Sequence, residues 1–424
     1  MNYDASTGWT NWSGSVSAVP KDFHHPTSHA ELARTVGQAK KLRVVGAGHS
    51  FTPLCVTDGT MVSLDQMAGE LVVSEDRKTV TVPGGWSLKH LTRKLWDHGL
   101  ALPNQGDVNP QALAGALATG THGTGRSLGS LSTFAEAFTL VLADGTITRA
   151  SRSESPELFE AQRLGLGLLG VVFEVEIAVL PAYHLEERIV SVPFADIRSR
   201  FDTLASTHRH AEFWWFPYAD SVILKTLDPI GPCPDPPERR GSGEEAFRVM
   251  CEMSAAKPEM IGELQRAAME APIDASRRGP AYSIFASDRT VRFEEMEYEV
   301  PESDGMDILA ELANWVRRND CPMAFPFEYR TVAADDIWLS PMNKGPCASI
   351  SVHQYVGMEW HELFAGTEKI LRAAGGRPHW AKQHSLTRTD VDALYPMAER
   401  FRAVRRTYDP DGKFLNSHLE ALFE

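Results

Sequence analysis

Between Pro20 and Tyr183, short apolar runs alternate with longer amphipathic stretches. The runs are brief and rich in valine and other strand formers, and they predict strands at 43–45, 79–82, 138–142 and 171–177. Two stretches between them predict helices over 28–40 and 87–98, because each begins with a serine suited to cap a helix. This order of elements predicts a mixed α/β layer structure.

The middle of the chain, residues 184–386, has a different pattern. Strand formers dominate at 213–216 and 291–300, and amphipathic stretches predict helices at 306–318 and 361–374. Residues 231–245 are dense in proline, glycine and charge, which predicts an exposed loop. We therefore expect a second, α+β region.

Charge and cysteine usage narrow the functional classes. The chain has 424 residues, with 42 Lys and Arg against 56 Asp and Glu, and a net charge of -14. This length corresponds to roughly two to three domains. The negative charge argues against nucleic acid or an anionic membrane surface as a partner.

Five scattered cysteines without a CxxC pair argue against a disulfide framework and a zinc site, so no metal is expected. Residues 1–14 have no basic start and no apolar stretch, and no apolar run is long enough to span a membrane. We expect a cytoplasmic protein without membrane contact.

A glycine-containing turn follows the first predicted strand directly: Val45, Gly46, Ala47, Gly48, His49, Ser50 and Phe51. Exposed backbone amides in such a turn can approach a pyrophosphate. The turn is not a G-x-G-x-x-G motif, because Ser50 and Phe51 replace small residues and no helix is predicted after it. A purely structural tight turn is the alternative.

A second segment is rich in small residues. Asn104, Gln105, Gly106 and Asp107 lead into residues 113–125, which read LAGALATGTHGTG. Small residues let the backbone approach a flat or bulky group. A helix packed closely on a sheet and followed by a glycine turn is the alternative, but two such loops in one region predict a dinucleotide cofactor.

The ordered set GAGHSF, PNQGD, LAGALATGTHGTG and LGLLGVVFEVEI resembles the FAD-binding domain of the vanillyl-alcohol oxidase superfamily. The later elements VRFEEMEYEVP, FEYRTVAADDIWLSP, HWAKQH and YDPDGKFLN resemble its aldonolactone oxidase branch, which also contains the alditol oxidases. The resemblance implies an α+β fold with a two-subdomain FAD-binding domain over 1–183. It also implies a substrate (cap) domain on an antiparallel sheet over 184–386, and a segment over 387–424 that returns to the FAD domain.

The resemblance implies FAD joined covalently through His49; a histidine that only hydrogen-bonds the turn is the alternative. Gly106 matches the position beside flavin C4a, where glycine leaves a path for dioxygen and implies an oxidase. Asp107 stands where alditol oxidases have serine, which argues against a small linear polyol. His122 matches a loop position near the cofactor. The other positions implied to contact FAD are Val45, Gly46, Ala47, Gly48, Ser50, Phe51, Asn104, Gly115, Thr119, Gly120, Thr121, Gly123, Val172 and Lys382.

Four residues match the family's catalytic positions. Glu328 and Arg330 are two apart in a strand-like run, so both side chains share a face and can bind a hydroxylated substrate; a surface ion pair is the alternative. Lys382 matches a lysine that favours the reduced anionic flavin, with a solvated lysine as the alternative. His353 matches a histidine that takes the hydroxyl proton, although a core histidine also fits. Glu297 is expected behind this set.

The expected activity is oxidation of a sugar-1,4-lactone, namely L-gulono-, L-galactono- or D-arabinono-1,4-lactone. The hydroxyl-bearing carbon would give hydride to flavin N5, and dioxygen would reoxidise the flavin and form hydrogen peroxide. An alditol oxidase of the xylitol or sorbitol type and an aldonolactone dehydrogenase with another acceptor are the enzymatic alternatives. A flavin-binding redox sensor without turnover is the alternative from another class.

Overall fold

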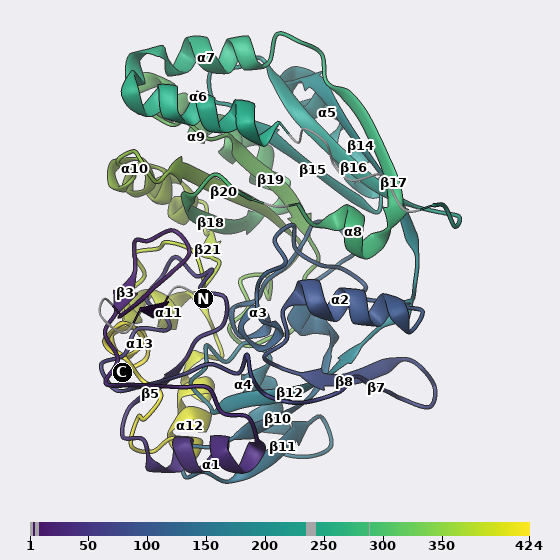
Figure 1. The fold of residues 1–424 in the computed structure, drawn as a ribbon. Helices are drawn as coiled ribbons and strands as arrows, with labels where there is room; N and C mark the ends of the chain where they lie inside the picture. Colours follow the sequence, from purple (N-terminus) through teal and green to yellow (C-terminus); the bar gives the residue numbers. More distant parts are fainter. Residues whose placement is uncertain (1–2, 5–7, 235–242, 288) are drawn as a thin grey trace.

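The computed structural model describes residues 3–4, 8–234, 243–287 and 289–424. Figure 1 shows two stacked lobes. The lower lobe holds both chain termini, and the upper lobe is formed by the middle of the chain. No helix in the described part of the chain is both long and apolar enough to cross a membrane.

Small sheets and short helices make up the lower lobe. Its strands are β1 (Tyr3–Asp4), β2 (Gly8–Thr10), β3 (Ser17–Ala18), β4 (Asp22–His24), β5 (Leu42–Val44), β6 (Thr60–Val62), β7 (Val72–Val73), β8 (Thr79–Pro83), β9 (Leu100–Ala101), β10 (Ala135–Val141), β11 (Ile147–Ser151), β12 (Val171–Ala178) and β13 (Leu180–Pro181). Among the described residues, five antiparallel strands pair in the order β11-β10-β12-β8-β7, and three parallel strands in the order β4-β6-β5. The four strands predicted from the sequence overlap β5, β8, β10 and β12.

The helices of this lobe are α1 (His29–Gln38), α2 (Leu88–Asp97), α3 (Leu113–Thr119) and α4 (Pro156–Gln162). Both predicted caps are confirmed: Ser28 accepts a hydrogen bond from the Glu31 amide, and Ser87 accepts one from the His90 amide. Each serine satisfies an amide that has no partner inside its helix. α3 ends at Gly120, whose φ of 77° suits a left-handed cap.

The upper lobe is built on an antiparallel sheet. Its strands are β14 (His184–Pro193), β15 (His210–Trp215), β16 (Ser221–Ile230), β17 (Asp274–Pro280), β18 (Phe293–Pro301), β19 (Phe327–Val332), β20 (Cys347–Tyr355) and β21 (Arg377–Pro378). These eight described strands pair in the order β17-β14-β16-β15-β19-β20-β18-β21. The fold class is therefore α+β, as predicted.

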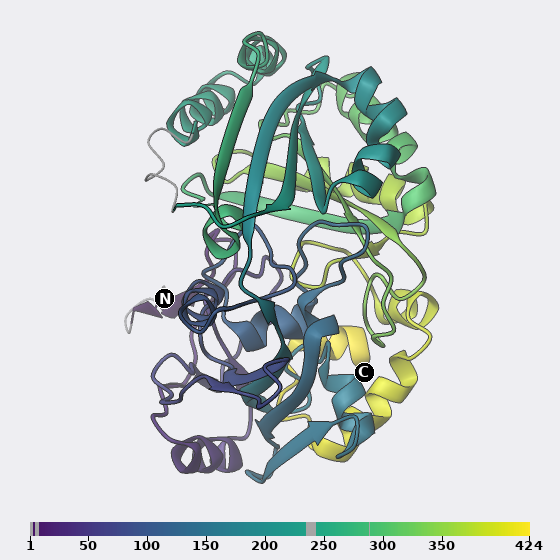
Figure 2. The same cartoon turned by 90° about the vertical axis from the view of Figure 1, so that its right-hand side faces the viewer.

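Helices cover both faces of this sheet. They are α5 (Phe194–Thr207), α6 (Glu244–Ala256), α7 (Ile261–Ala268), α8 (Ala281–Phe285), α9 (Gly305–Arg318) and α10 (His361–Ala373). Figure 2 shows α5, α9 and α10 on one side of the sheet and α6 and α7 on the other. α6 begins at Glu244, inside the predicted loop 231–245, of which residues 235–242 lie outside the described part.

Apolar packing joins the last helices to the lower lobe. These helices are α11 (Arg388–Leu394), α12 (Ala398–Tyr408) and α13 (Ser417–Phe423). Phe401 and Phe423 belong to the same buried core as Phe138 of β10. A separate core, which includes Phe213 and Leu312, fills the space between the upper sheet and its covering helices. The domain boundaries at 183 and 386 stay predictions.

Candidate active site

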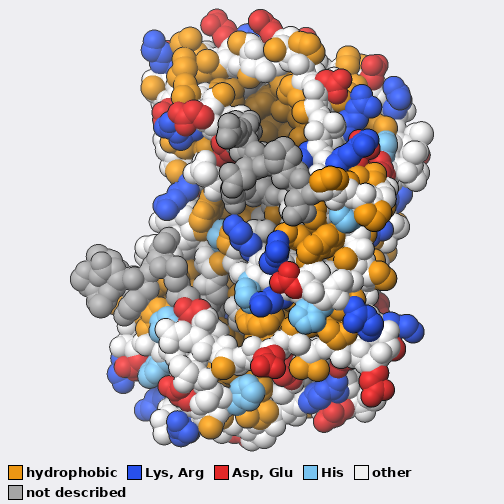
Figure 3. Space-filling view, turned by 45° about the vertical axis from the view of Figure 1, so that its right-hand side comes forward, with side chains coloured by type: hydrophobic (Ala, Val, Ile, Leu, Met, Phe, Trp, Pro, Cys, Tyr) orange, Lys and Arg blue, Asp and Glu red, His pale blue; other side chains and the backbone are white. Residues whose placement is uncertain are grey.

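Residues from both lobes line a cavity of about 2000 Å³. The lower lobe contributes His49 and Gly106, among others, to its lining. All four predicted catalytic residues line it too: Glu328, Arg330, His353 and Lys382. Figure 3 shows the molecule hollowed on the upper half of this face, with apolar side chains inside the hollow.

Each glycine-rich segment has a glycine in close contact with neighbouring backbone or side-chain atoms. A Cβ on Gly46 would lie 2.9 Å from the Cβ of Ala112, which caps α3. A Cβ on Gly123 would lie 2.2 Å from the carbonyl oxygen of Gln105. No real Cβ comes so close to a backbone atom, so glycine is required where the loop 121–125 packs on the loop 104–107.

Buried polar groups in this region fit FAD. The side-chain amide nitrogens of Asn104 and Gln105 are buried and have no hydrogen-bond partner among the described residues. A buried donor without an acceptor is costly. The carbonyl and phosphate oxygens of a flavin dinucleotide are acceptors of the required kind. These residues are therefore suited to hold the cofactor.

Six of the predicted cofactor positions line the cavity: His49, Gly106, Asp107, Thr121, His122 and Lys382. Val172 lies on β12, with its side chain in the lower core. At Gly115, on α3, a Cβ would meet no described atom within 4 Å apart from its chain neighbours and the nearby backbone of its own helix. Contact between FAD and the residues outside the cavity lining stays a prediction.

The surroundings of His49 favour the neutral ring that a nucleophilic histidine needs. Its Nδ1 lies 3.2 Å from the carbonyl oxygen of Ala47, which only accepts, so Nδ1 carries the proton and Nε2 keeps its lone pair. The ring stacks on Trp12 with 5.5 Å between centroids. Burial lowers the pKa of His49, which favours the neutral ring. These features agree with a nucleophilic role for His49, and its attachment to a flavin stays a prediction.

Glu328 and Arg330 lie on one face of β19, as predicted. Their carboxylate and guanidinium are 3.6 Å apart, and both side chains are buried. Antiparallel pairing places Trp214 opposite Glu328 and Glu212 opposite Arg330. Because Glu328 and Arg330 are both buried and line the cavity, they do not form a surface ion pair.

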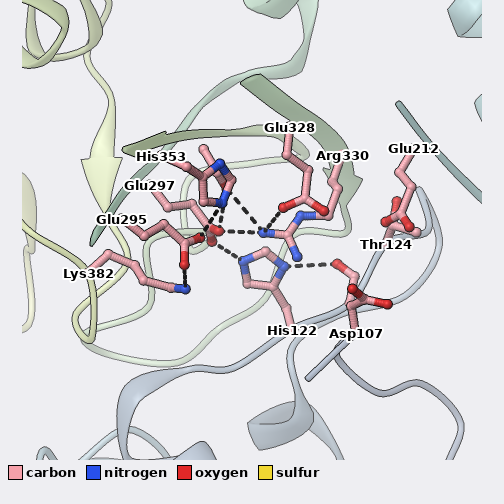
Figure 4. Close-up of polar contacts among 12 residues, drawn as sticks. Asp107, His122, Thr124, Glu212, Glu295, Glu297, Glu328, Arg330, His353 and Lys382 are labelled. Atoms are coloured by element: carbon pink, nitrogen blue, oxygen red, sulfur yellow. Dashed lines mark hydrogen bonds and ion pairs between the residues drawn. The ribbon is translucent and has the colours of Figure 1, made fainter. Parts of the chain in front are cut away.

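Glu297 on β18 forms a buried ion pair with Arg330. Its carboxylate accepts hydrogen bonds from the Arg330 guanidinium and, at 2.7 Å, from the Ser351 hydroxyl. It also lies 2.8 Å from Nε2 of His122, as Figure 4 shows. Burial opposes ionisation of Glu297, but Arg330 and His122 hold its pKa well below the usual value. The Arg330 guanidinium is therefore fixed in position by a charged carboxylate.

His122 carries charge at neutral pH. Burial alone would lower its pKa, but the carboxylates of Glu297 and Glu299 raise the pKa of His122 to about 9. Burial raises the pKa of Glu299 to about 7. His379, whose ring centroid lies 5.7 Å from that of His122, is neutral, because burial lowers its pKa to about 3.

Lys382 and His353 meet at Glu295 on β18. The Lys382 ammonium pairs with the Glu295 carboxylate, which lies 3.4 Å from Nε2 of His353. Burial opposes ionisation of Glu295, but Lys382 and His353 lower its pKa to about 2. Nδ1 of His353 lies 3.3 Å from the Pro326 carbonyl oxygen, so it carries a proton and leaves Nε2 as the site of basicity.

Asp107 joins the two lobes through a second charged cluster. Its carboxylate pairs with Arg289, accepts a hydrogen bond from the Ser287 hydroxyl at 2.9 Å, and lies 3.5 Å from the Lys225 ammonium. Lys225, on β16, also lies 2.9 Å from Glu212. Burial opposes ionisation of Asp107, but Arg289 and Lys225 lower its pKa to about 2. Upper-lobe partners thus bind this carboxylate, and its contact with FAD stays a prediction.

Some charged residues of the site were not among those predicted. Glu295 and Glu299 carry a signal in the sequence, because with Glu297 they alternate with apolar residues and so share one face of β18. Lys225 lies in β16 and Arg289 in a loop, and neither segment has a motif that indicates a functional residue.

Two groups of side chains have candidate metal-ligating atoms within 4.8 Å of one another in the described chain: His122, Glu297 and His379, and Glu295, Glu328 and His353. Arg330 already pairs with Glu297 and lies 3.6 Å from Glu328, and Lys382 pairs with Glu295. Because protein cations already balance these carboxylates, we assign no metal to either group, and the expectation of no metal stays a prediction.

Comparison with models of known protein families shows to which family the chain belongs. Residues 175–422 match the family model described as D-arabinono-1,4-lactone oxidase, and residues 20–151 match that of the FAD binding domain. The chain belongs to the D-arabinono-1,4-lactone oxidase family. The predicted membership of the aldonolactone oxidase branch is confirmed.

Relatives of this family member cover nearly all of its length. The L-gulono-1,4-lactone dehydrogenase of Mycobacterium tuberculosis is 37% identical, over 97% of each chain. The L-gulonolactone oxidase of Bos taurus is 31% identical, over 97% of each chain. The alditol oxidase of a Streptomyces species is 30% identical, over 99% of this chain and 100% of the relative.

The fold of the family member is also that of cholesterol oxidase from Brevibacterium sterolicum. The TM-score is 0.82 over 99% of this chain and 97% of the other, at 18% identity, so this likeness shows the fold alone. This likeness confirms the predicted fold class. The family models and the sequence relatives confirm the FAD cofactor and an oxidoreductase acting on CH–OH donors. The protein is an aldonolactone oxidoreductase.

Proposed function

We propose that the protein oxidises a sugar-1,4-lactone of the L-gulono-, L-galactono- or D-arabinono- type and passes the electrons to dioxygen, with formation of hydrogen peroxide. The observation that carries this proposal is the convergence of Arg330, Glu328 and His353 on one cavity that His49 and Gly106 also line. A cytoplasmic location also stays a proposal.

Arg330 and Glu328 bind the substrate in this proposal. A lactone presents a carbonyl oxygen, which accepts hydrogen bonds, and hydroxyl groups, which donate them. The guanidinium donates to the oxygen atoms, and the Glu328 carboxylate accepts from a hydroxyl. Glu297 accepts hydrogen bonds from both Arg330 and Ser351, so the guanidinium is already oriented before the substrate binds.

His353 takes the proton of the hydroxyl that is oxidised. Its Nε2 faces the cavity beside Glu295, so the imidazolium that forms is paired with a carboxylate at 3.4 Å. Bound FAD supplies the acceptor for the hydride, at N5. Lys382, which also lines the cavity, would stabilise the negative charge of a reduced flavin bound there.

His49 forms the covalent link to FAD in this proposal. Its neutral ring and free Nε2 support that role. Gly106, which lines the cavity, supports dioxygen as acceptor, because this residue has no side chain that could block the approach to a bound flavin.

A dehydrogenase is the second candidate, because the relative that is 37% identical is named L-gulono-1,4-lactone dehydrogenase. One experiment tests both. The FAD-loaded protein is mixed without oxygen with each of the three lactones, with xylitol and with sorbitol, while the flavin absorption band is recorded. We expect a lactone to bleach the band and air to restore it with release of peroxide.

If xylitol or sorbitol bleaches the band and no lactone does, the donor is a polyol. If a lactone bleaches the band but air restores it only over many minutes, the protein is a dehydrogenase. If none of these donors bleaches the band, the proposed function is wrong.

A further inference from the structure

The cavity has an apolar end beyond its charged residues. Ile223 of β16 and Phe216, the residue after β15, line this end, and Phe247, Met250 and Leu264 line it from α6 and α7. In Figure 3 the apolar side chains of the hollow lie in the upper half of the molecule, where Figure 1 places α6 and α7. We call this part of the lining the apolar end.

The change from charged to apolar lining follows the strands of the sheet. Glu212 of β15 pairs with Lys225 of β16, and two residues further on Trp214 pairs with Ile223. Residues two apart on a strand share a face. One face of the sheet therefore turns from charged to apolar within the cavity, and a single ligand can touch both kinds of lining.

An aromatic contact joins the apolar end to the proposed reaction centre. The ring of Phe325 lies 4.7 Å from that of Phe247 on α6 and 6.0 Å from that of His353, measured between centroids. Phe325 and His353 both line the cavity. A ligand whose hydroxyl reaches His353 can thus place its remaining atoms against the apolar end.

A small lactone leaves this end unused. Pockets of about 300–1,000 Å³ already enclose drug-sized ligands, so this cavity of about 2000 Å³ has room for part of the FAD and also for a donor larger than a small lactone. At its mouth, Val249 and Met253 of α6 line the cavity with 41% and 43% of their surface exposed. Apolar surface in water favours an apolar occupant.

We propose that the apolar end binds an alkyl or aryl substituent of the alcohol donor, so that the preferred donors are amphiphilic. The hydroxylated part of such a donor lies at Arg330, Glu328 and His353, and its substituent lies between α6, α7 and the sheet. This inference rests on the proposed function for the chemistry at the hydroxylated end, whereas binding of the substituent is measured without turnover.

Calorimetry on the FAD-loaded protein tests the binding. Octyl β-D-glucoside, below its micellar concentration, is compared with methyl β-D-glucoside. The longer chain adds about seven methylene groups, so we expect a dissociation constant lower by at least tenfold and a more negative heat-capacity change. Equal affinity, or no binding of either glucoside, overturns the inference.

Two variants of α7 locate the octyl chain. Leu264 lines the cavity, whereas Ala267, on the same helix, is exposed and lies outside the lining. Leu264→Gln should remove most of the preference for the octyl glucoside, and Ala267→Gln should keep it. If Leu264→Gln keeps the preference in a protein of unchanged circular dichroism, the chain binds elsewhere and the inference is wrong.

Competition separates this inference from the proposed function. Octyl glucoside should raise the lactone concentration needed for half-maximal flavin reduction, and Leu264→Gln should abolish that effect. If octyl glucoside binds tightly but does not compete, the apolar end serves another molecule and the inference fails while the function stands. If it binds through Leu264 and no lactone reduces the flavin, the apolar end is supported and the lactone is the wrong donor.

Discussion

Nε2 of His122 lies 2.8 Å from the carboxylate of Glu297, and both side chains are buried. His122 follows α3 in the lower lobe, and Glu297 lies on β18 in the upper sheet. The same carboxylate also holds Arg330. One carboxylate therefore connects the cofactor-binding loops with the residue proposed to bind the substrate, and we regard Glu297 as a positioning residue.

Replacement of Glu297 should loosen Arg330. Glu297→Gln removes the charge that two buried cations share, and loss of one partner of a buried ion pair costs about 3–5 kcal/mol. We expect a lower free energy of unfolding in urea, a higher lactone concentration at half-maximal rate, and flavin reduction about tenfold or more slower.

Glu299→Gln is the matched control, because Glu299 lies on the same face of β18 and burial raises its pKa to about 7. Its neutral amide resembles the protonated carboxyl that is already present near neutral pH, so this change should be mild. Equal effects of the two substitutions would contradict a special role for Glu297.

The same contact predicts how stability depends on pH. The pKa of His122 is raised to about 9 in the folded protein, against about 6.5 in an unfolded chain. Folding therefore takes up a proton between these values, and the stabilisation is complete below pH 6.5 and lost as the pH rises toward 9. We expect the free energy of unfolding to fall by on the order of 1–3 kcal/mol over this range. His122→Gln should remove this part of the slope; an unchanged slope would assign it to other groups.

Contiguous motifs explain why part of this site was predictable. Glu328 and Arg330 stand two apart on one strand, and His49 stands in a short turn after β5, so a run of few residues fixes each side chain relative to its neighbours. The buried pairs between Asp107, Lys225 and Arg289 join a lower-lobe loop to β16 and to the segment before β18. Lys225 and Arg289 lie 118 and 182 residues after Asp107 in the chain. Local sequence patterns contain no information on pairs so far apart.

Periodicity also predicted some elements better than others. The alternation of charged and apolar residues over β12 and the strand formers over β18 predict these two strands, whereas no pattern predicts β14 and β16, ten residues each. In β16 the sequence SVILKTLDPI lacks a regular alternation. The carboxylates of Glu212 and Asp107 balance the charge of the buried Lys225. These partners come close to Lys225 only when the chain has folded and its two lobes are assembled.

Loss of the Lys382 ammonium should slow flavin reduction. Lys382→Met keeps much of the side-chain volume but removes the ammonium that pairs with the Glu295 carboxylate. The pKa of Glu295, about 2 in the present structure, should rise. We expect anaerobic reduction by the lactone to slow by about tenfold to a hundredfold, measured by stopped-flow absorbance. Lys382→Arg should recover part of the rate, and equal rates in all three proteins would remove Lys382 from the reaction.

Covalent attachment is tested by denaturation. His49→Ala removes the only side-chain nitrogen of the GxGHS turn, so flavin should be released when the protein is unfolded in detergent. The unchanged protein should retain yellow, fluorescent flavin on a denaturing gel. His122→Ala is the control, because His122 also lines the cavity but pairs with Glu297. Flavin retained by unfolded His49→Ala would place the link at another residue.

Gly106 controls access of dioxygen in the proposed function, and its surroundings allow a clean test. A Cβ at this position would lie 3.3 Å from the His122 carbonyl oxygen and 3.5 Å from Cγ2 of Thr121, so alanine fits after a shift of a few tenths of an ångström. Gly106→Ala should therefore fold, bind FAD and be reduced by the donor at a nearly normal rate. Reoxidation by dioxygen should slow by about tenfold or more, because the added methyl group narrows the path to the cofactor. The reduced protein is mixed with aerated buffer and the return of the flavin band is followed. Unchanged reoxidation with unchanged reduction would show that oxygen reaches the flavin by another route.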